Sequence, residues 1–184
     1  MNFPRDYIIK TQRCRLRRVS ENDIPHIFSA TRFKGFNDGM LWDPPSNKEE
    51  LYEPLKHNLE AWDLDTAYNF TIESLQEEMF IGRISIRKTS EEGTWNIGFF
   101  IHPLEQGKGY MTEAVRAILD FGFTQLGATR IEARHAIWNK KSERILTKIG
   151  MKFIHYIPQG FMKKGTWVEE NLLAIDRKTW NANK

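Results

Sequence analysis

The stretch 94–112, TWNIGFFIHPLEQGKGYMT, reads as a buried strand, a short loop with two glycines and the start of a helix. Apolar side chains occupy both faces of the strand, which is typical of a central strand, and Pro103 ends it because proline has no N–H for strand pairing. Residues Gln106–Gly109 then lead into a helix that begins near Tyr110 or Met111. Such a loop presents unpaired backbone N–H groups at the positive end of a helix dipole. The stretch therefore predicts an anion site, and a phosphate group suits it best.

Two common phosphate-binding loops can be compared with this stretch. A P-loop requires Ser or Thr after its Gly-Lys pair and another glycine five positions before the lysine. Here Gly109 follows Lys108 and Pro103 occupies the earlier position, so a P-loop is excluded. A dinucleotide fingerprint, G-x-G-x-x-G, is matched at Gly107 and Gly109, but Thr112 stands in place of its third glycine. This second alternative is matched only in part and stays open.

The composition is that of one globular domain spanning residues 1–184. A chain of 184 residues can bury roughly 70% of the surface that it exposes when unfolded. Its 40% hydrophobic residues and six tryptophans supply a core, and a net charge of +3 does not require nucleic acid as a partner. The single cysteine, Cys14, excludes an internal disulfide and suits a reducing compartment. The first residues do not resemble a signal peptide and no apolar run approaches a membrane span, so we expect a cytoplasmic protein without a membrane partner.

The spacing of apolar residues predicts strands and helices along the whole chain. The predicted strands are 7–10 with 15–19 as one kinked strand, 68–72, 80–86, 95–101, 130–138, 153–157 and 167–175. The predicted helices follow Ser20, Ser46, Tyr110 and Asn139, with a Ser46–Glu49 capping box at the second. The three strands between 68 and 101 form an antiparallel meander, and the next strand pairs in parallel with 95–101 because a helix intervenes.

Gln106–Met111 resembles the acetyl-CoA loop of the GNAT N-acetyltransferase superfamily, Q/R-x-x-G-x-G/A, with Met111 where the pattern has a small residue. A second motif, Asn139-x-x-Ser142 followed by KIGMKF, also resembles this superfamily, and the segment 11–24 is similar to the start of its RimJ/RimL-like branch. The resemblance implies a single GNAT-like α+β (mixed α/β) domain. Its central twisted sheet would be mixed but mostly antiparallel, with about seven strands, a splayed parallel pair and about four flanking helices.

The same resemblance implies where acetyl-CoA, the cosubstrate, would bind. Its pantetheine would lie along the free backbone of the central strand, with Gly98 as the bulge that splays the strands. Asn139 and Ser142 would contact the cofactor, although Asn139 also fits an ordinary helix N-cap with Ser142 in the first turn. The other residues implied to bind are Phe99, Phe100 and Ile101 along the strand, and Gln106, Gly107, Lys108, Gly109, Tyr110 and Met111 around the diphosphate.

For catalysis, the resemblance implies direct attack of an amine on acetyl-CoA, without a covalent acyl-enzyme. Ser142 would protonate the leaving thiolate, which needs little help because a thiol pKa is about 8.5. An α-amine is about 10–20% neutral at pH 7, so a weak base is sufficient. Glu169 is implied as that base, its neighbour Glu170 faces the opposite side of the strand, and Glu73 is a further candidate. The five histidines show no metal-ligand spacing, so we expect no metal.

The resemblance implies an N-acetyltransferase acting on a primary amine, either the N-terminal α-amine of a protein such as a ribosomal protein, or a small amine. Two alternatives stay open: a non-catalytic acyl-CoA-binding module, and a nucleotide-dependent oxidoreductase that uses the two glycines of the loop. The acceptor site is expected between the loop 33–42, the helix after Ser46 and a basic loop, 159–165, where Lys163 and Lys164 hint at an acidic acceptor. Exposed aromatic residues leave room for a homodimer.

Overall fold

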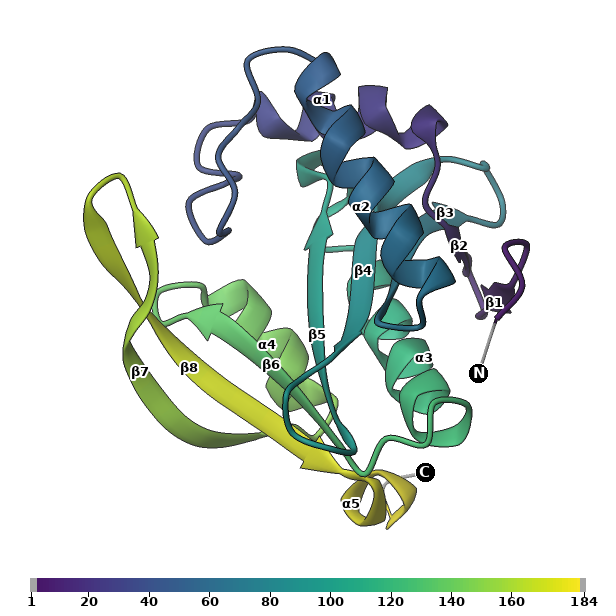
Figure 1. Ribbon diagram of the computed structural model, residues 1–184, viewed down its shortest axis with the longest axis vertical. Coiled ribbons are helices and arrows are strands. Elements are labelled where there is room, and N and C mark those ends of the chain that lie inside the picture. The colour runs from purple at the N-terminus through teal and green to yellow at the C-terminus, as the bar shows by residue number, and fades with distance from the viewer. Residues whose placement is uncertain (1–2, 183–184) are drawn as a thin grey trace.

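One eight-stranded sheet runs through the protein, with the strand order β1-β2-β3-β4-β5-β6-β8-β7 (Figure 1). The structure is a computed structural model, and it describes residues 3–182. Neighbouring strands are antiparallel except β5 and β6, which are parallel, so the predicted mixed sheet with its antiparallel meander is confirmed. The strands are β1 (Ile8–Lys10), β2 (Cys14–Arg18), β3 (Ala67–Ser74), β4 (Phe80–Lys88), β5 (Thr94–Ile101), β6 (Arg130–Ala136), β7 (Lys152–Lys163) and β8 (Thr166–Asp176).

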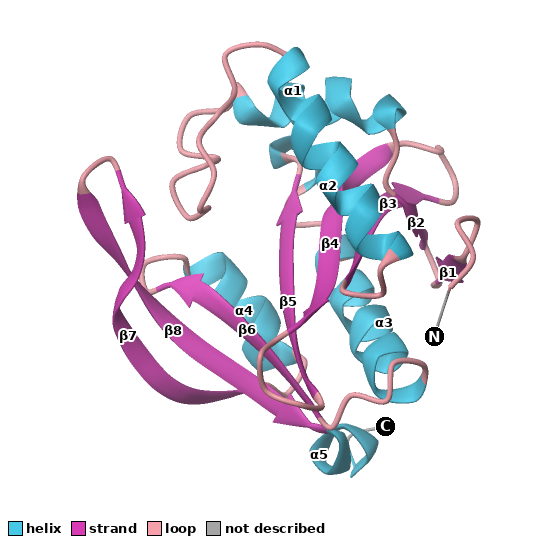
Figure 2. Cartoon of the chain, viewed as in Figure 1, coloured by secondary structure: helices cyan, strands magenta, loops and turns pink. Residues whose placement is uncertain are grey.

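Helices cover both faces of the sheet. In Figure 2, α1 and α2 lie in front of the sheet, whereas α3 and α4 lie behind it; we call these sides the α2 face and the α3 face. No helix among the described residues is long and apolar enough to cross a membrane. The α-helices are α1 (Ile24–Thr31), α2 (Tyr52–Asp63), α3 (Tyr110–Thr124), α4 (Lys140–Lys148) and α5 (Arg177–Ala182).

Side-chain packing assigns alternate residues of each strand to these two faces. Phe80 and Phe100 pack with apolar side chains of α1 and α2, on the α2 face. Ile86 and Ile131 lie on the α3 face, where their Cδ1 atoms would be 2.8 and 2.6 Å from a Cβ placed on Gly122. Gly122 therefore lets α3 pack directly on β4 and β6, in a close-packed core that leaves no room for a larger residue.

The first predicted strand, kinked between 10 and 15, is in fact a hairpin of two strands. The Thr11 N–H donates to the Cys14 carbonyl oxygen (2.8 Å), and the Thr11 hydroxyl accepts from the Cys14 N–H (3.0 Å). These bonds close a turn, and Ile8 then lies opposite Arg17 in an antiparallel pair. The turn is made by a threonine side chain rather than by glycine or proline, so the strand pattern alone did not reveal it.

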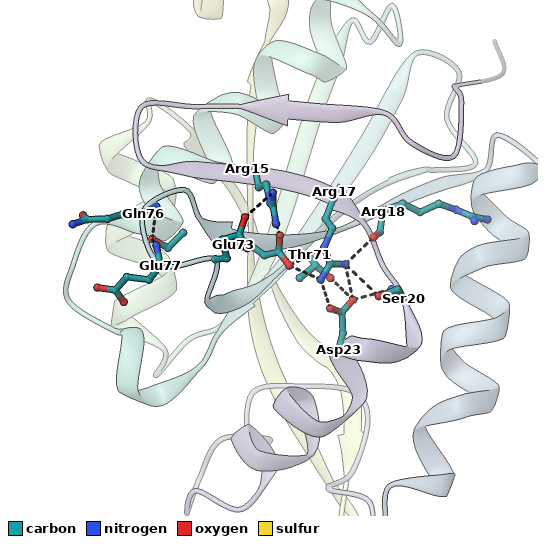
Figure 3. A network of polar contacts seen from close by, with 11 residues as sticks. Arg15, Arg17, Arg18, Ser20, Asp23, Thr71, Glu73, Gln76 and Glu77 are labelled. Atoms are coloured by element: carbon teal, nitrogen blue, oxygen red, sulfur yellow. Dashed lines mark hydrogen bonds and ion pairs between the residues drawn. The ribbon is translucent and has the colours of Figure 1, made fainter.

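A buried carboxylate fixes α1 to the sheet (Figure 3). Ser20 and Asp23 form the predicted start of the first helix, and the Ser20 N–H donates to Asp23 Oδ2 (2.8 Å). The same carboxylate accepts from the Thr71 hydroxyl (2.6 Å) and from both terminal nitrogens of Arg17 (2.6 and 3.2 Å). Arg17 also donates to Glu73 Oε1 from its Nε (2.8 Å). Four donors therefore share the two oxygens of Asp23, which is only 1% exposed.

The segment before the second helix is held by a bond to Asn47, one residue later than the predicted Ser46–Glu49 box. The Asn47 Oδ1 accepts from the Glu50 N–H (3.2 Å), and Glu50 Oε2 accepts from the Ser46 N–H (3.1 Å). A short 3-10 turn, Glu49–Leu51, precedes α2 and displaces the cap. The helix itself is as predicted.

Strands β7 and β8 form a long hairpin whose tip reaches the loop 33–45 (Figure 1). The predicted loop 159–165 is wrong: β7 continues to Lys163, and only Lys164 and Gly165 form the turn. Both have positive φ (48° and 79°), as a two-residue hairpin turn of this kind requires. The Lys163 ammonium donates to the carbonyls of Met40 (3.0 Å) and Trp42 (2.8 Å), so it is held inside the protein rather than offered to an acidic acceptor.

Candidate active site

The two parallel strands β5 and β6 separate halfway along their length. They pair from Thr94 opposite Arg130 to Ile97 opposite Ala133, and then each continues without pairing to the other. The predicted bulge at Gly98 is absent, since the register between β4 and β5 is continuous through this residue. Gly98 instead leaves space on the α2 face, where an added Cβ would lie 3.1 Å from a guanidinium nitrogen of β4.

The separation leaves backbone groups of β5 without a strand partner. The His102 N–H donates to the Ile81 carbonyl (2.8 Å). Because hydrogen-bonded residues alternate along an antiparallel pair, the N–H and C=O groups of the even-numbered residues of β5 point toward β4. The N–H and C=O groups of Phe99 and Ile101 therefore point to the side that β6 has left. Phe100, which was predicted to offer its backbone as well, directs its peptide groups to β4. Two of the three predicted residues thus have a free backbone edge.

The ring of Phe100 lies on the α2 face beneath the loop 33–45. Its centroid is 5.4 Å from that of Phe36 and 6.2 Å from that of Trp42, in edge-to-face and tilted arrangements. A Cβ on Gly39 of the same loop would be 3.2 Å from the Trp138 ring. The loop therefore spans from β5 to the segment that follows β6.

The glycine loop presents a run of unpaired amides at the start of α3. Gly107 and Gly109 have φ values of +82° and +84°, which favour glycine. Within residues 3–182, the N–H groups of residues 107–112 have no hydrogen-bond acceptor. A Cβ on Gly107 would meet nothing within 4 Å, so no side chain fills the concave side of the loop there. The Met111 side chain is 3% exposed and belongs to the core, so it does not enter the loop either.

Basic side chains surround the loop. Arg13 donates to the Lys108 carbonyl (2.9 Å), pairs with Glu113 (2.8 Å) and lies 4.8 Å from the centre of the Tyr110 ring. Lys108 pairs with Glu105 (2.8 Å). Sequence analysis missed Arg13, since an arginine in an alternating strand carries no signal that it will reach a loop 95 residues away. Arg13 ties the first strands to the loop and adds positive charge beside the free amides.

The first turn of α4 lies next to the same loop. The Lys141 ammonium donates to Gln106 Oε1 (2.7 Å), and Asn139 Oδ1 accepts from the Ser142 N–H (3.2 Å). Asn139 is therefore an N-cap, as its spacing suggested. Ser142 is half-buried, and its hydroxyl has no hydrogen-bond partner among the residues that the structure describes. It is free to contact a ligand that reaches from the glycine loop into the split between the strands.

The two neighbouring glutamates of β8 face opposite sides, as predicted. Glu169 lies on the α3 face and contacts the Tyr156 hydroxyl. Glu170 lies on the α2 face with Arg134 and is only 9% exposed. Burial raises the pKa of Glu170, although the charges of Arg134 and His135 act in the opposite direction. Glu170 is therefore the carboxylate that faces the acceptor side of the split.

A separate cavity of about 420 Å³ lies near the Asp23 network and not at the glycine loop. Glu73, the further candidate base, lines it and is bound by Arg15 (2.6 Å) and Arg17 (2.6 Å). Its carboxylate is thus occupied by two guanidinium groups. Among the described residues, no group of three or more His, Cys, Asp or Glu side chains is placed to hold a metal ion.

Comparison with known protein families identifies the family to which this fold belongs. The family described as "Acetyltransferase (GNAT) domain" matches residues 13–152. The chain belongs to the GNAT acetyltransferase family. It is 35% identical over 117 residues to the uncharacterized N-acetyltransferase YnaD of Bacillus subtilis (strain 168), a match that covers 64% of this chain and 69% of YnaD.

Solved structures of this family share the whole fold. A GNAT-family acetyltransferase from Bacillus anthracis is 26% identical, with a TM-score of 0.84 over 94% of this chain and 99% of that chain. RimJ from Mycobacterium smegmatis, solved in complex with CoA-disulfide, is 20% identical, with a TM-score of 0.79 over 95% of this chain and 88% of that chain. The RimJ/RimL-like fold expected from the sequence is therefore confirmed.

Replacing Glu170 by Gln is expected to stabilise the protein at neutral pH. A raised folded-state pKa means that the ionised carboxylate opposes folding above its unfolded pKa of about 4.3, and that this cost fades as the pH falls. The gain should appear as a higher melting temperature than that of the parent at pH 8, and it should shrink toward pH 4.5. Thermal melts of the Glu170→Gln and Glu169→Gln variants between pH 4.5 and 8 measure this. A Glu170→Gln variant that is less stable than the parent at pH 8 contradicts the assignment.

Proposed function

We propose that this protein transfers an acetyl group from acetyl-CoA to a primary amine, by direct attack of the amine in a ternary complex. The observation that carries the proposal is the combination of a split parallel strand pair with a row of free amides beside it. The N–H groups of residues 107–112 suit a diphosphate, because backbone amides at a helix start favour phosphate oxygens. The free edges of Phe99 and Ile101 suit the two amides of a pantetheine chain, which pair like a short strand.

The residues present fit coenzyme A in charge as well as in shape. Acetyl-CoA supplies the acetyl group as a thioester, a form that an amine attacks without a covalent enzyme intermediate. In this assignment Gln106, Gly107, Lys108, Gly109, Tyr110 and Met111 form the diphosphate loop. Arg13 and Lys141 lie beside this loop and add positive charge. Asn139 caps α4 and orients its first turn toward the thioester.

The two proton transfers are assigned to opposite faces of the sheet. Ser142, at the start of α4 on the α3 face, would donate a proton to the leaving thiolate. Glu170, on the α2 face, would accept the proton of the attacking amine, and its raised pKa suits a base that works near neutral pH. Glu169 was implied as the base by resemblance, but its contact with Tyr156 on the other face makes it the second choice. An amine can then enter from one face while the thiol leaves toward the other.

The acceptor amine is proposed to be the α-amine of a protein N-terminus, such as that of a ribosomal protein, or a small amine. An α-amine needs only a weak base such as a carboxylate, because about 10–20% of it is already neutral at pH 7. The loop 33–45 and the tip of the β7–β8 hairpin, joined through Lys163, enclose the acceptor side.

Replacing Gly109 by Val is expected to abolish binding of acetyl-CoA. Valine at a φ of +84° is strained, and its Cβ would lie 3.3 Å from a nitrogen of Arg13, so the amides would lose their arrangement. Isothermal titration calorimetry measures the binding. The matched control is Gly127→Val, which has the same strain (φ +71°) at the far end of α3 and should bind normally. Unchanged acetyl-CoA binding by Gly109→Val contradicts the loop assignment, and binding of NAD(H) instead of acetyl-CoA favours the oxidoreductase alternative.

Replacing Ser142 by Ala is expected to lower kcat by roughly 10²-fold while leaving the Kd for acetyl-CoA nearly unchanged, because only the proton transfer is lost. Release of free CoA over a panel of amines, detected with a thiol reagent, measures turnover. A Ser142→Ala variant with the parent's kcat removes Ser142 from this role. Tight binding of acetyl-CoA with no CoA release from any amine favours the non-catalytic binding module.

A further inference from the structure

Three arginines stand on the α2 face around the point where β5 and β6 separate. Arg83 and Arg87 lie on β4, opposite Phe100 and Asn96 of β5. Arg134 on β6 follows the last residue that pairs with β5. The Cα atoms of Arg83 and Arg87 are about 13 Å apart, since a strand rises about 3.3 Å per residue. All three residues therefore lie on the α2 face, the side from which an acceptor would reach the split in the proposed function.

None of these three arginines forms an ion pair within residues 3–182. Arg87 donates only to Asn96 Oδ1 (3.2 Å), and neither Arg83 nor Arg134 has a hydrogen-bond partner among the described residues. The arginines of β2 differ, since Arg15, Arg17 and Arg18 are each bound to a carboxylate. The three arginines at the split therefore lack a carboxylate partner, whereas the arginines of β2 have one.

Arg83 is the most buried of the three, since Arg87 and Arg134 are exposed. It is partly buried, and burial lowers its pKa to about 10, so it remains charged at neutral pH. Asp23 attracts it, but the oxygens of Asp23 already accept four hydrogen bonds from Ser20, Thr71 and Arg17. A buried cation without a partner destabilises the fold. A protein can retain such a residue at a site where a bound ligand supplies the missing partner.

The carboxylates on this face do not neutralise the arginines. Glu132, midway along β6, forms its ion pair with Arg130 (3.9 Å) and not with Arg134. Glu170 is near Arg134 without forming an ion pair with it. Lys163 is bound by the loop 33–45 and adds no free charge. An anionic group of a bound molecule is therefore the partner that this surface lacks.

We propose that the acceptor is an amine that also carries a carboxylate, and that Arg83, assisted by Arg87 and Arg134, binds that carboxylate. A guanidinium group matches a carboxylate with two parallel hydrogen bonds, which fixes orientation as well as position. The acceptor class is thus an amino acid, or a peptide with an acidic group close to its N-terminus. This inference rests on the proposed function, because it places the carboxylate beside the attacking amine.

The test compares acceptors that differ only in the carboxylate. Alanine and alanine amide, and the dipeptides Asp-Ala-amide and Asn-Ala-amide, are assayed for CoA release with wild type, Arg83→Gln and Arg83→Lys. The acidic member of a pair is expected to have a kcat/KM about 10-fold higher or more with wild type, because a hydrogen-bonded charge pair is lost in the other. Arg83→Gln should abolish this preference through KM, with kcat and the Kd for CoA little changed. Arg83→Lys should restore it in part.

A surface control and a stability measurement separate this role from a structural one. Arg116→Gln, an exposed arginine on α3, should leave the acceptor preference unchanged. Arg83→Gln should melt at the temperature of the parent or above it, since it removes an unpaired charge, whereas a structural arginine would lower it. A markedly lower melting temperature together with an unchanged preference overturns the proposal.

The remaining outcomes distinguish this inference from the proposed function. Equal kcat/KM values for acidic and neutral acceptors overturn the carboxylate assignment and leave acetyl transfer intact. If no acceptor releases CoA, calorimetry with CoA present decides: binding of Asp-Ala-amide but not Asn-Ala-amide, or of alanine but not alanine amide, lost in Arg83→Gln, supports the carboxylate site and refutes the transferase, whereas no binding of any of them refutes both. A preference for succinyl-CoA over acetyl-CoA that Arg83→Gln removes assigns the carboxylate to the acyl donor and overturns the proposal.

Discussion

The loss of pairing between β5 and β6 is the constraint on which the rest of the structure depends. Backbone N–H and C=O groups in a folded protein are almost always paired, and leaving them unpaired away from water is costly. Here the edge of β5 after Ile97 and the amides of residues 107–112 are left open at the same end of the sheet. The fold keeps this gap open because β6 turns into α4 through the Asn139 cap, while β5 stays bonded to β4. In the proposed function, a ligand with amide and phosphate groups would complete both sets of bonds.

The surroundings of the gap make its two sides chemically different. On the α3 face lie the glycine loop, the basic residues beside it and Ser142 at the start of α4. On the α2 face lie the buried Glu170, three unpaired arginines and the aromatic group under the loop 33–45. The Asp23 network holds α1 against β2 and β3, and the Lys163 contacts hold the hairpin tip against the loop. The sheet therefore separates a side suited to the thioester from a side suited to an acceptor.

Local features were predictable from the sequence because their causes are local. Gly107 and Gly109 occupy positions with positive φ, which favour glycine. The alternation of apolar residues determines which face of the sheet each strand residue lies on. Asn139 caps α4 through a bond of its side chain to a residue only three positions away. Glu169 and Glu170 were expected on opposite faces for the same reason. The GNAT resemblance supplied the fold that these pieces build.

Long-range contacts were not predictable, because a single sequence does not record them. Arg13 reaches the glycine loop only after the sheet has formed, and Lys163 finds its carbonyl partners only when the β7–β8 hairpin is long enough. The length of that hairpin depends on the irregularity between Ile157 and Phe161, which admits Pro158 and Gly160 into β7, residues that normally indicate a loop. Likewise, the sequence indicates that Arg83 is a solvated strand residue. Only the structure shows that Asp23, which attracts Arg83, is already bound by Arg17.

The measurement that tests the central claim most directly is a titration of the ¹⁵N-labelled protein with CoA, followed amide by amide by NMR. The account predicts that the N–H signals of Phe99, Ile101 and residues 107–112 shift together and saturate with one binding constant. The Phe100 N–H, which is bonded to β4, serves as an internal reference and should shift less. Binding of CoA with shifts confined to other residues, such as those of the cavity beside Asp23, would contradict the account.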